Sequence, residues 1–389
     1  YLWCEMLKVD WPKWPNYGEE EYLAVKRVIK SNQLFADKEV RDFEDKFSEY
    51  VGCKYALGVG NATEGLHLSL IALDIGSGDE VIVTSYSWIS TASCILMQNA
   101  VPIFCDIEKK SLGICPVDIE KKISPRTKAI IFVHMFGYPA RVDEIIQISK
   151  KYNIPIIEDA SHAHGASVSN IKAGNFGDIS VFSLHQRKAL SVGDGGVVCT
   201  NNVDFRNKIY RLRSFGDDEL SYNYRMTEFA GALGKVGLLK LDSQNNTRVE
   251  NALYLSELLR GNEFLTVRTC GELEQCVYYA VLIELKKDIS NLEQRLKNLQ
   301  NKGICIRKTW DPLHRHPHFN PKSIMPKRGL PWKEEKYDGI MKNVLYKDLI
   351  LENVDNFLPS KIFELYVHPP VDLNLIKFAS IEINKEFSG

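Results

Sequence analysis

Short apolar runs alternate with amphipathic segments along the first two thirds of the chain. Runs of branched apolar residues at 80–84, 129–133 and 155–157 have the length and composition of buried strands. Between such runs, segments 63–73 and 142–152 carry apolar residues at the three- and four-residue spacing of helices. The alternation predicts an α/β protein whose large domain has a mostly parallel sheet between layers of helices.

The pattern changes near residue 242. A helix is predicted at 225–241, and the sequence beyond it is richer in Asn and Gln. There we predict a strand at 277–285 and helices at 291–301 and about 373–386. This mixture is typical of a second, smaller α+β domain.

The length and composition agree with two domains. A chain of 389 residues with 44% hydrophobic content can bury a large core. We predict an N-terminal arm at 1–24, a ligand-binding large domain at 25–242 and a smaller C-terminal domain at 243–389. The formal net charge of −1 gives no reason to expect nucleic acid or a membrane surface as a partner. The richest apolar stretch, 276–285, is too short to span a membrane.

The nine cysteines are scattered, and several lie inside apolar runs. Their odd number, the lack of a recognisable signal peptide and the lack of paired spacing predict reduced, buried thiols in a cytoplasmic protein. The sequence begins at Tyr1 rather than Met, so we expect residues upstream of this numbering.

Lys188 is the first candidate for chemistry. It follows an apolar strand-like run at 178–182 and precedes a Gly-Asp-Gly-Gly turn at 193–196. An amine in such a place can be held rigidly, desolvated and made nucleophilic toward an aldehyde. Lys188 is therefore predicted to form a Schiff base.

Asp159 supplies a second requirement. It ends the strand-like run at 155–159, and ligands of open α/β sheets bind at the carboxyl ends of strands. Pyridoxal 5′-phosphate (PLP) needs a lysine to hold its aldehyde and a carboxylate to keep its ring nitrogen protonated. Lys188 and Asp159 match that pair, so the large domain at 25–242 is predicted to bind PLP.

The third requirement is a phosphate site. A strand-like run at 55–60 meets the predicted helix at Asn61-Ala62-Thr63, and helix N-termini bind phosphate. Ser183 can add a hydroxyl group. Taken singly, Asn61-Ala62-Thr63 is more often only a helix cap, Asp159 a turn residue and Lys188 a solvated charge. The prediction of a PLP site therefore depends on the order and spacing of the three signals.

Six sequence blocks occur in the order seen in a known family. They are NATEGL at 61–66, GDEVIV at 78–83, PIFCD at 102–106, EDASHAHG at 158–165, FSLHQRK at 182–188 and YNYRMTE at 222–228. Together they resemble the DegT/DnrJ/StrS sugar aminotransferases. The resemblance covers about residues 11–242 and is looser beyond. It implies the aspartate aminotransferase fold, also called fold type I, with seven strands in the mostly parallel sheet of the large domain.

The resemblance implies roles for several residues. Lys188 looks like the lysine that binds PLP and moves protons, and Asp159 looks like the partner of the pyridine nitrogen. Trp88 is similar to the aromatic that stacks on the cofactor ring, although a core aromatic after a strand is an equally good interpretation. His162 lies where the family has Gln or His beside the phenolic oxygen.

A shared phosphate site is implied as well. Ala62, Thr63 and Ser183 would hold the phosphate, and Asn223 would reach in from the other subunit of a homodimer. The family more often has Gly at the position of Ala62, and Asp194 replaces a commoner Glu.

Four further residues are candidates for the substrate pocket: His185, Arg225, Trp310 and His314. An equally good interpretation of His185 is that it does not contact the substrate but holds other site residues in place by hydrogen bonds. The alternating histidines at 314–318 suggest a metal site, but Pro317 disfavours a central strand and no ligand set accompanies them, so we predict no metal.

The function implied is a PLP-dependent aminotransferase that moves an amino group from glutamate or glutamine to a keto or aldehyde sugar in amino-sugar biosynthesis. The opening WPKWP at 11–15 resembles members that act on keto-cyclitols, so a carrier-free substrate is the alternative to a nucleotide sugar. A related dehydratase branch has histidine in place of the lysine, and Lys188 favours transamination. Two other functions are disfavoured. A nicotinamide-dependent oxidoreductase would have a Gly-x-Gly-x-x-Gly motif between a strand and a helix, and the sequence has none. A PLP-binding regulator would have a DNA-binding appendage, and the sequence shows none.

Overall fold

The computed structural model describes residues 8–35, 37–216, 219–319, 331 and 346–388. A seven-stranded sheet forms the large domain, in the spatial order β1-β9-β8-β5-β4-β2-β3. Only β9 runs antiparallel to its neighbours, so the predicted mostly parallel seven-stranded sheet is confirmed. Its strands are β1 Tyr55–Val59, β2 Glu80–Thr84, β3 Val101–Cys105, β4 Thr127–Val133, β5 Ile156–Asp159, β8 Ile179–Ser183 and β9 Gly196–Thr200.

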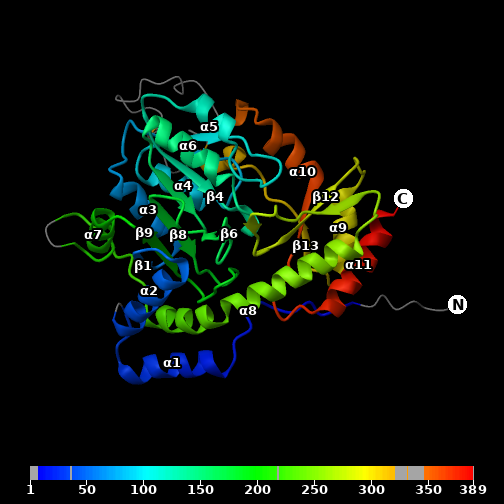
Figure 1. Ribbon diagram of the computed structural model, residues 1–389, viewed down its shortest axis with the longest axis horizontal. Coiled ribbons are helices and arrows are strands. Elements are labelled where there is room, and N and C mark those ends of the chain that lie inside the picture. Colours follow the sequence, from blue (N-terminus) through cyan, green and yellow to red (C-terminus); the bar gives the residue numbers. More distant parts are fainter. Residues whose placement is uncertain (1–7, 36, 217–218, 320–330, 332–345, 389) are drawn as a thin grey trace.

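Helices cover both faces of this sheet (Figure 1), because both faces of its central strands are apolar. In β2, Val81 and Val83 pack into one core cluster, while Ile82 between them packs into another. The first cluster includes residues of α3 (Ala62–Ala72) and α4 (Ser90–Met97), and the second includes residues of α5 (Pro116–Lys122) and α6 (Val142–Tyr152). The sheet is thus buried between two helical layers, with α7 (Val203–Leu212) beside β1 and α3.

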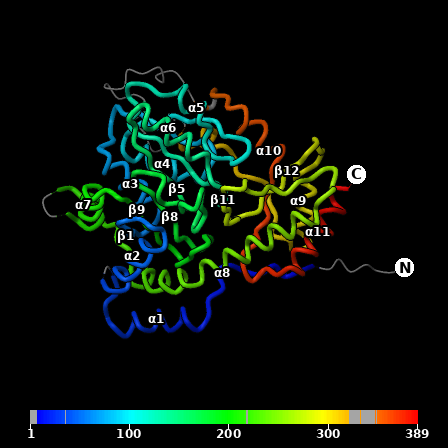
Figure 2. Tube along the Cα trace, in the orientation of Figure 1, coloured from blue at the N-terminus to red at the C-terminus, as the bar shows by residue number. Residues whose placement is uncertain are grey.

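Two N-terminal helices and one long helix complete this part of the chain. Figure 2 shows α1 (Glu19–Ser31) alongside α8 (Glu228–Leu258), where Ala24 and Val28 pack against Ala232. Helix α2 (Lys38–Val51) packs on α8 and on β1.

The predicted helix at 225–241 has different ends in the structure. Thr227 caps α8 by accepting a hydrogen bond from the backbone N–H of Ala230, so the helix begins at Glu228. It continues for 31 residues, because no Pro or Gly occurs between 242 and 258 and buried positions keep recurring at helical spacing. The Asn and Gln residues after 242 therefore form a polar face of α8 and do not end the helix. The division into domains at 242 stays a prediction.

The remaining chain builds a second, antiparallel sheet in the order β10-β12-β14-β13. Its elements are β10 Leu265–Val267, β12 Val281–Leu285, β13 Ile306–Lys308, β14 Ile362–Leu365, α9 Leu292–Asn301, α10 Leu358–Lys361 and α11 Leu373–Phe387. The predicted strand at 277–285 begins four residues late, since Tyr278 adopts a positive φ of 46°. A small sheet of β6 (Ser167–Val168), β7 (Ile171–Lys172) and β11 (Glu274–Gln275) joins the two parts.

The expectation that every cysteine is reduced is wrong for one pair. Cys270 and Cys276 form a disulfide that closes the turn around β11, with Cα atoms 6.0 Å apart. The five residues between them contain no repeated spacing that would have predicted the bond. In the part of the chain that the structure describes, no helix has the length and apolar character needed to cross a membrane.

Candidate active site

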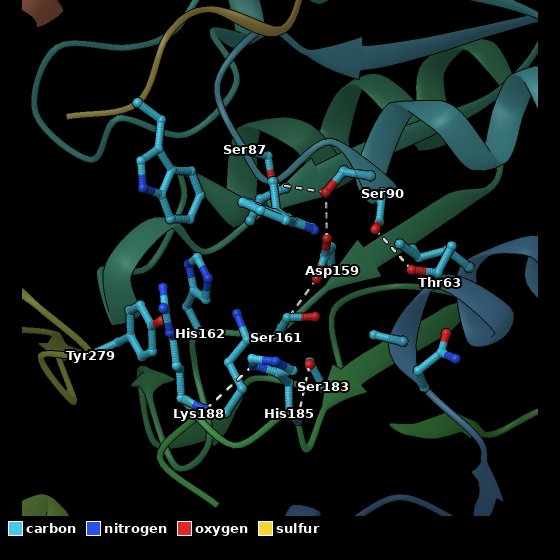
Figure 3. Close-up of a pocket in the computed structure, with 18 of the residues that line it drawn as sticks. Thr63, Ser87, Ser90, Asp159, Ser161, His162, Ser183, His185, Lys188 and Tyr279 are labelled. Atoms are coloured by element: carbon cyan, nitrogen blue, oxygen red, sulfur yellow. Dashed lines mark hydrogen bonds between the residues drawn. The ribbon is translucent and has the colours of Figure 1, made fainter. Parts of the chain in front are cut away.

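A cavity of about 280 Å³ lies beside the carboxyl ends of β5 and β8, between the two sheets. Figure 3 shows Lys188 and Asp159 directed into the same space. The structure brings together nine of the twelve predicted site residues on the cavity wall: Ala62, Thr63, Trp88, Asp159, His162, Ser183, His185, Lys188 and Trp310.

Lys188 lies in a loop that folds back on itself, the lysine loop (residues 184–195). The backbone N–H of Leu184 donates to the carbonyl of Gly195 at 2.8 Å, and the N–H of Lys188 donates to the carbonyl of His185 at 2.7 Å. The Lys188 Nζ lies 5.0 Å from the centre of the Tyr279 ring. The loop thus fixes where the amine enters the cavity.

The electrostatics of Lys188 favour a neutral amine. Burial lowers its pKa to about 7, while the Asp159 carboxylate acts in the opposite direction and Arg187 and Arg307 add to the lowering. An amine with this pKa is unprotonated in a large fraction of molecules at neutral pH, which is what a nucleophile toward an aldehyde requires.

This shift makes the stability of the cofactor-free protein pH-dependent. Unfolded Lys188 keeps its proton up to its ordinary value of 10.5, whereas folded Lys188 releases it near 7. The unfolded state binds more protons between these values, so the contribution of Lys188 to the unfolding free energy rises with pH there. We expect Lys188→Met to remove a rise on the order of 2 kcal/mol between about pH 7 and about pH 9, measured by denaturant unfolding. Parallel pH profiles of the two proteins would contradict the lowered pKa.

Asp159 ends β5 with its carboxylate buried and supported on both oxygens. Its Oδ1 accepts from the backbone N–H of Ser161 at 3.1 Å, and its Oδ2 accepts from the Thr91 hydroxyl at 2.8 Å. Thr91 in turn shares a hydrogen bond of 2.8 Å with Ser87. These bonds hold an ionised carboxylate toward the cavity, where it can accept a further hydrogen bond from a cationic N–H group.

His162 is a buried neutral donor. Its Nδ1 accepts from the backbone N–H of Phe136 at 3.3 Å, which places the remaining proton on Nε2. Burial lowers its pKa well below the ordinary value, and the charge of Lys188 adds to this. The ring lies parallel to that of Tyr279, with centroids 4.4 Å apart. The His162 ring is therefore held in one orientation, in which it can donate one hydrogen bond from Nε2.

The N-terminus of α3 forms an anion cradle on the opposite wall. Asn61 caps the helix by accepting from the N–H of Glu64 at 3.0 Å, and the first N–H groups of the helix, at Ala62 and Thr63, have no acceptor within it. The Thr63 hydroxyl donates to Ser90 at 2.8 Å (Figure 3), and Ser183 supplies another hydroxyl on the cavity wall.

Gly196 allows this cradle to form. A Cβ atom at residue 196 would lie 2.6 Å from the backbone carbon of Asn61 and 2.8 Å from the nitrogen of Ala62. We expect Gly196→Ala to displace the helix N-terminus and weaken phosphate binding at least about tenfold, because backbone atoms cannot move aside cheaply. Isothermal titration with PLP measures this. The control Gly76→Ala adds a methyl group where nothing lies within 4 Å, and its affinity should match the wild type.

Two tryptophans stand at the wall of the cavity. Trp88 is 59% exposed, which is incompatible with the alternative interpretation of it as a core residue. Its ring meets that of Trp310 edge to face at 5.8 Å, and Trp310 lies 5.8 Å from His162. Both indoles can therefore contact a flat ligand between them and His162.

Three predicted residues lie outside this wall. The amide oxygen of Asn223 accepts two hydrogen bonds from Arg225, at 3.0 and 2.8 Å; Asn223 is exposed and Arg225 is half-buried. His314 is buried elsewhere, with its Nε2 3.2 Å from Asp355 and its ring near Phe104. The described residues contain no group of three side chains suited to a metal.

Several polar residues of the wall were not predicted from the sequence; among them are Arg187, Asp194, Tyr279 and Arg307. Tyr279 follows the irregular turn before β12 and Arg307 lies on β13, so both come from the second sheet, far from the motifs. Arg307 is paired with Glu364 at 2.8 Å. Arg187 and Asp194 belong to the lysine loop. The signals that could have found them were the position of Arg187 in the matched block at 182–188 and that of Asp194 in the turn at 193–196.

A lysine with a lowered pKa, a buried carboxylate and a helix N-terminus around one cavity define an α/β enzyme of the aminotransferase class. The chain belongs to the DegT/DnrJ/EryC1/StrS aminotransferase family, whose model matches residues 15–359. The family resemblance is thus confirmed over most of the chain.

Named relatives agree with this membership. The chain is 30% identical to the L-glutamine:2-deoxy-scyllo-inosose aminotransferase of Streptomyces lividus, over 80% of this chain and 81% of that protein. It is 32% identical to the GDP-perosamine synthase of Caulobacter vibrioides, over 72% of this chain and 78% of that protein. The crystal structure of an aminotransferase from Psychrobacter cryohalolentis matches with a TM-score of 0.85 and 26% identity, over 97% of this chain and 98% of the other.

Proposed function

We propose that the cavity binds PLP and that the protein transfers an amino group to a keto or aldehyde sugar or a sugar-like cyclitol. The observation that carries this proposal is the meeting of Lys188, with its pKa lowered to about 7, and the buried Asp159 in one cavity. PLP-dependent family members support it. When bound, PLP supplies an aldehyde that reacts with amines and a ring that accepts electrons from the substrate carbon.

The residues present fit that cofactor. The first N–H groups of α3, with Thr63 and Ser183, suit a phosphate group, and the space that Gly196 leaves open lets the helix N-terminus approach it. Asp159 suits a protonated ring nitrogen. The Nε2–H of His162 suits a phenolate oxygen, and Trp88 suits the face of a flat ring.

The chain's own groups account for the proton transfers. The Lys188 amine would hold the aldehyde of the cofactor, with release of one water molecule. With an amino donor bound, the Lys188 Nζ would take a proton from the α-carbon of the donor and return it later in the transfer. The Tyr279 ring restricts the space around Nζ, and the Thr91 hydroxyl holds the Asp159 carboxylate in the same cavity.

The substrates are proposed from the relatives and from the charge of the wall. One relative is named for glutamine and a scyllo-inosose, another for GDP-perosamine, so both a cyclitol and a nucleotide-linked keto sugar are candidates. Arg187 and Arg307 bring positive charge that suits the carboxylate of glutamate or glutamine. Since Lys188 lies in the cavity, transamination is favoured over the dehydratase reaction of a lysine-free branch. The cytoplasm is the proposed location.

An absorbance experiment tests the proposal. PLP is added to the purified protein, followed by glutamate or glutamine and then by a panel of keto sugars and keto-cyclitols. We expect the visible band of the bound cofactor to disappear with one donor and return with the correct acceptor. A protein that binds PLP but responds to no donor would contradict transamination, and one that binds NADH instead would support an oxidoreductase.

We also propose a homodimer with shared sites, in which Asn223 reaches the phosphate site of the partner. Its support is that Asn223 is exposed and lies outside the cavity of its own chain. Mixing Lys188→Ala with Asn223→Ala chains tests this, since a mixed dimer with shared sites has one intact site. Half of randomly paired dimers are mixed, so about a quarter of wild-type activity should return. If Asn223→Ala alone is severely impaired and mixing restores nothing, Asn223 acts within its own subunit.

A further inference from the structure

Arg248 is a buried cation at the middle of α8. Its side chain has no exposed surface, and no carboxylate among the described residues pairs with it. It donates from Nε to His368 at 2.9 Å, from Nη1 to Asn245 at 2.9 Å and from Nη2 to the carbonyl of Ala189 at 3.5 Å. Burial lowers its pKa to about 9. A cation without a counterion is costly to bury, so this arrangement needs a reason beyond packing.

The N-terminal arm lies on this cation. The guanidinium of Arg248 lies 4.8 Å from the centre of the Trp14 ring, and Trp14 stacks on His368 at 5.3 Å with 25° between the planes. Trp14 is thereby held between a cation and an imidazole. Its indole N–H donates to the backbone carbonyl of Lys188 at 2.8 Å. The arm therefore fixes the backbone of the residue that carries the reactive amine.

A second residue of the arm reaches the same loop. The Tyr17 hydroxyl donates to the carbonyl of Ser191 at 3.1 Å. Carbonyls at 188, 189 and 191 thus accept bonds from the arm or from α8. Among the described residues that line the cavity, neither Trp14, Tyr17 nor Arg248 appears. Trp14 reaches the cavity by its bond to the lysine loop and by stacking on His368, whose ring lies 5.6 Å from that of Tyr279.

We propose that Trp14, seated on Arg248, is a positioning residue that holds the Lys188 backbone so that its amine meets the cofactor aldehyde. This inference rests on the proposed function. Without the bond, Lys188 has more conformations to lose when it joins the aldehyde, and PLP binds less tightly. The effect of losing this bond depends on the lysine, because the bond ends on the Lys188 carbonyl, whereas stacking on His368 needs only an aromatic ring at residue 14.

A double-mutant cycle measures this dependence. Trp14→Phe keeps an aromatic ring on Arg248 but cannot donate to the Lys188 carbonyl. We expect it to weaken PLP binding roughly fivefold, the net value of one ordinary hydrogen bond. In a Lys188→Ala background PLP binds without a covalent bond, and there Trp14→Phe should change the affinity by less than about 1.5-fold. Affinities are measured by titration in absorbance or fluorescence.

Trp11→Phe is the matched control. Trp11 lies in the same arm, and its indole N–H also donates to a backbone carbonyl, that of Tyr366 at 3.2 Å. The substitution removes the same kind of bond without touching the lysine loop, so PLP affinity should stay unchanged in both backgrounds. Tyr17→Phe, a milder change than Trp14→Phe, should weaken binding about twofold and only when Lys188 is present.

Two outcomes overturn the proposal: equal weakening by Trp14→Phe with and without Lys188, or no weakening in either background. If Trp14→Phe does not fold, the absence of a lysine-dependent effect of Tyr17→Phe overturns it.

If the wild type itself binds no PLP, the proposed function fails. In that case the role of Trp14 is tested on the cofactor-free protein, by acylating its amines as a function of pH and measuring the acylation of Lys188 by mass spectrometry. The Lys188 amine should then titrate at higher pH in Trp14→Phe and not in Trp11→Phe, and equal titration overturns the positioning role.

Discussion

Lys188→Ala is expected to abolish transamination while leaving PLP able to bind through its phosphate and ring. The variant loses both the amine that holds the aldehyde and the group that moves the proton. General acid–base catalysis alone contributes about 100- to 10,000-fold, so we expect turnover to fall by at least about 1000-fold. Steady-state kinetics with the substrates identified by absorbance measure this loss.

The control for Lys188→Ala is another half-buried lysine. Lys172 donates to the carbonyl of Tyr50 at 2.9 Å and lies over the Tyr50 ring, away from the cavity. Lys172→Ala should keep its turnover. Borohydride reduction of the wild type should attach the cofactor to the peptide that contains Lys188. Attachment to any other lysine, or turnover of Lys188→Ala within tenfold of the wild type, contradicts the assignment.

The large sheet could be predicted because its strands are buried on both faces. Continuous apolar runs such as Glu80–Thr84 carry that information locally, and the helices between them show their own spacing. The carboxyl ends of β5 and β8 then place Asp159 and Ser183 beside the lysine loop. The predicted cofactor residues Ala62, Thr63 and His162 reach the same cavity for the same reason, since they follow strands of one sheet or lie close behind them.

The features that sequence did not reveal depend on distant segments. Tyr279 and Arg307 enter the cavity from the second sheet, and no local pattern shows which of its residues face the first. The environment of His314 follows from its contact with Asp355, 41 residues away, and that pairing is invisible in the motif around Trp310. The contact of Trp14 could not be predicted either. The Trp-Pro repeat does not show that the Trp14 indole donates to the carbonyl of Lys188, 174 residues further along the chain.

Adjacent carboxylates at the end of β5 have separate tasks. Glu158 is fully buried and accepts hydrogen bonds from the backbone N–H groups of Gly174, Phe176 and Gly177 and from the Ser180 hydroxyl. It thereby stabilises the turn before β8. Its neighbour Asp159 points to the opposite face, into the cavity, as alternation along a strand requires. Changing each to its amide should therefore affect different properties.

Asp159→Asn is expected to keep the fold and much of the PLP binding but to lose most of its turnover. The amide oxygen can still accept from the Ser161 N–H, and the Thr91 hydroxyl can turn to accept from the new amide group while donating to Ser87. A neutral amide, however, does not stabilise a protonated ring nitrogen. The lost charge-assisted bond should cost about 2–4 kcal/mol in the transition state, or roughly 30- to 1000-fold in turnover.

Glu158→Gln is the matched control for Asp159→Asn, since it makes the same chemical change one residue earlier. A Gln side chain has one acceptor oxygen where Glu158 uses two, so its amide group would face backbone N–H donors. We expect a loss of unfolding free energy of about 2–3 kcal/mol with turnover per folded molecule largely kept. Thermal melts and kinetics on both variants separate the two roles. Turnover of Asp159→Asn within threefold of the wild type would show that Asp159 does not face the ring nitrogen, whatever Glu158→Gln does.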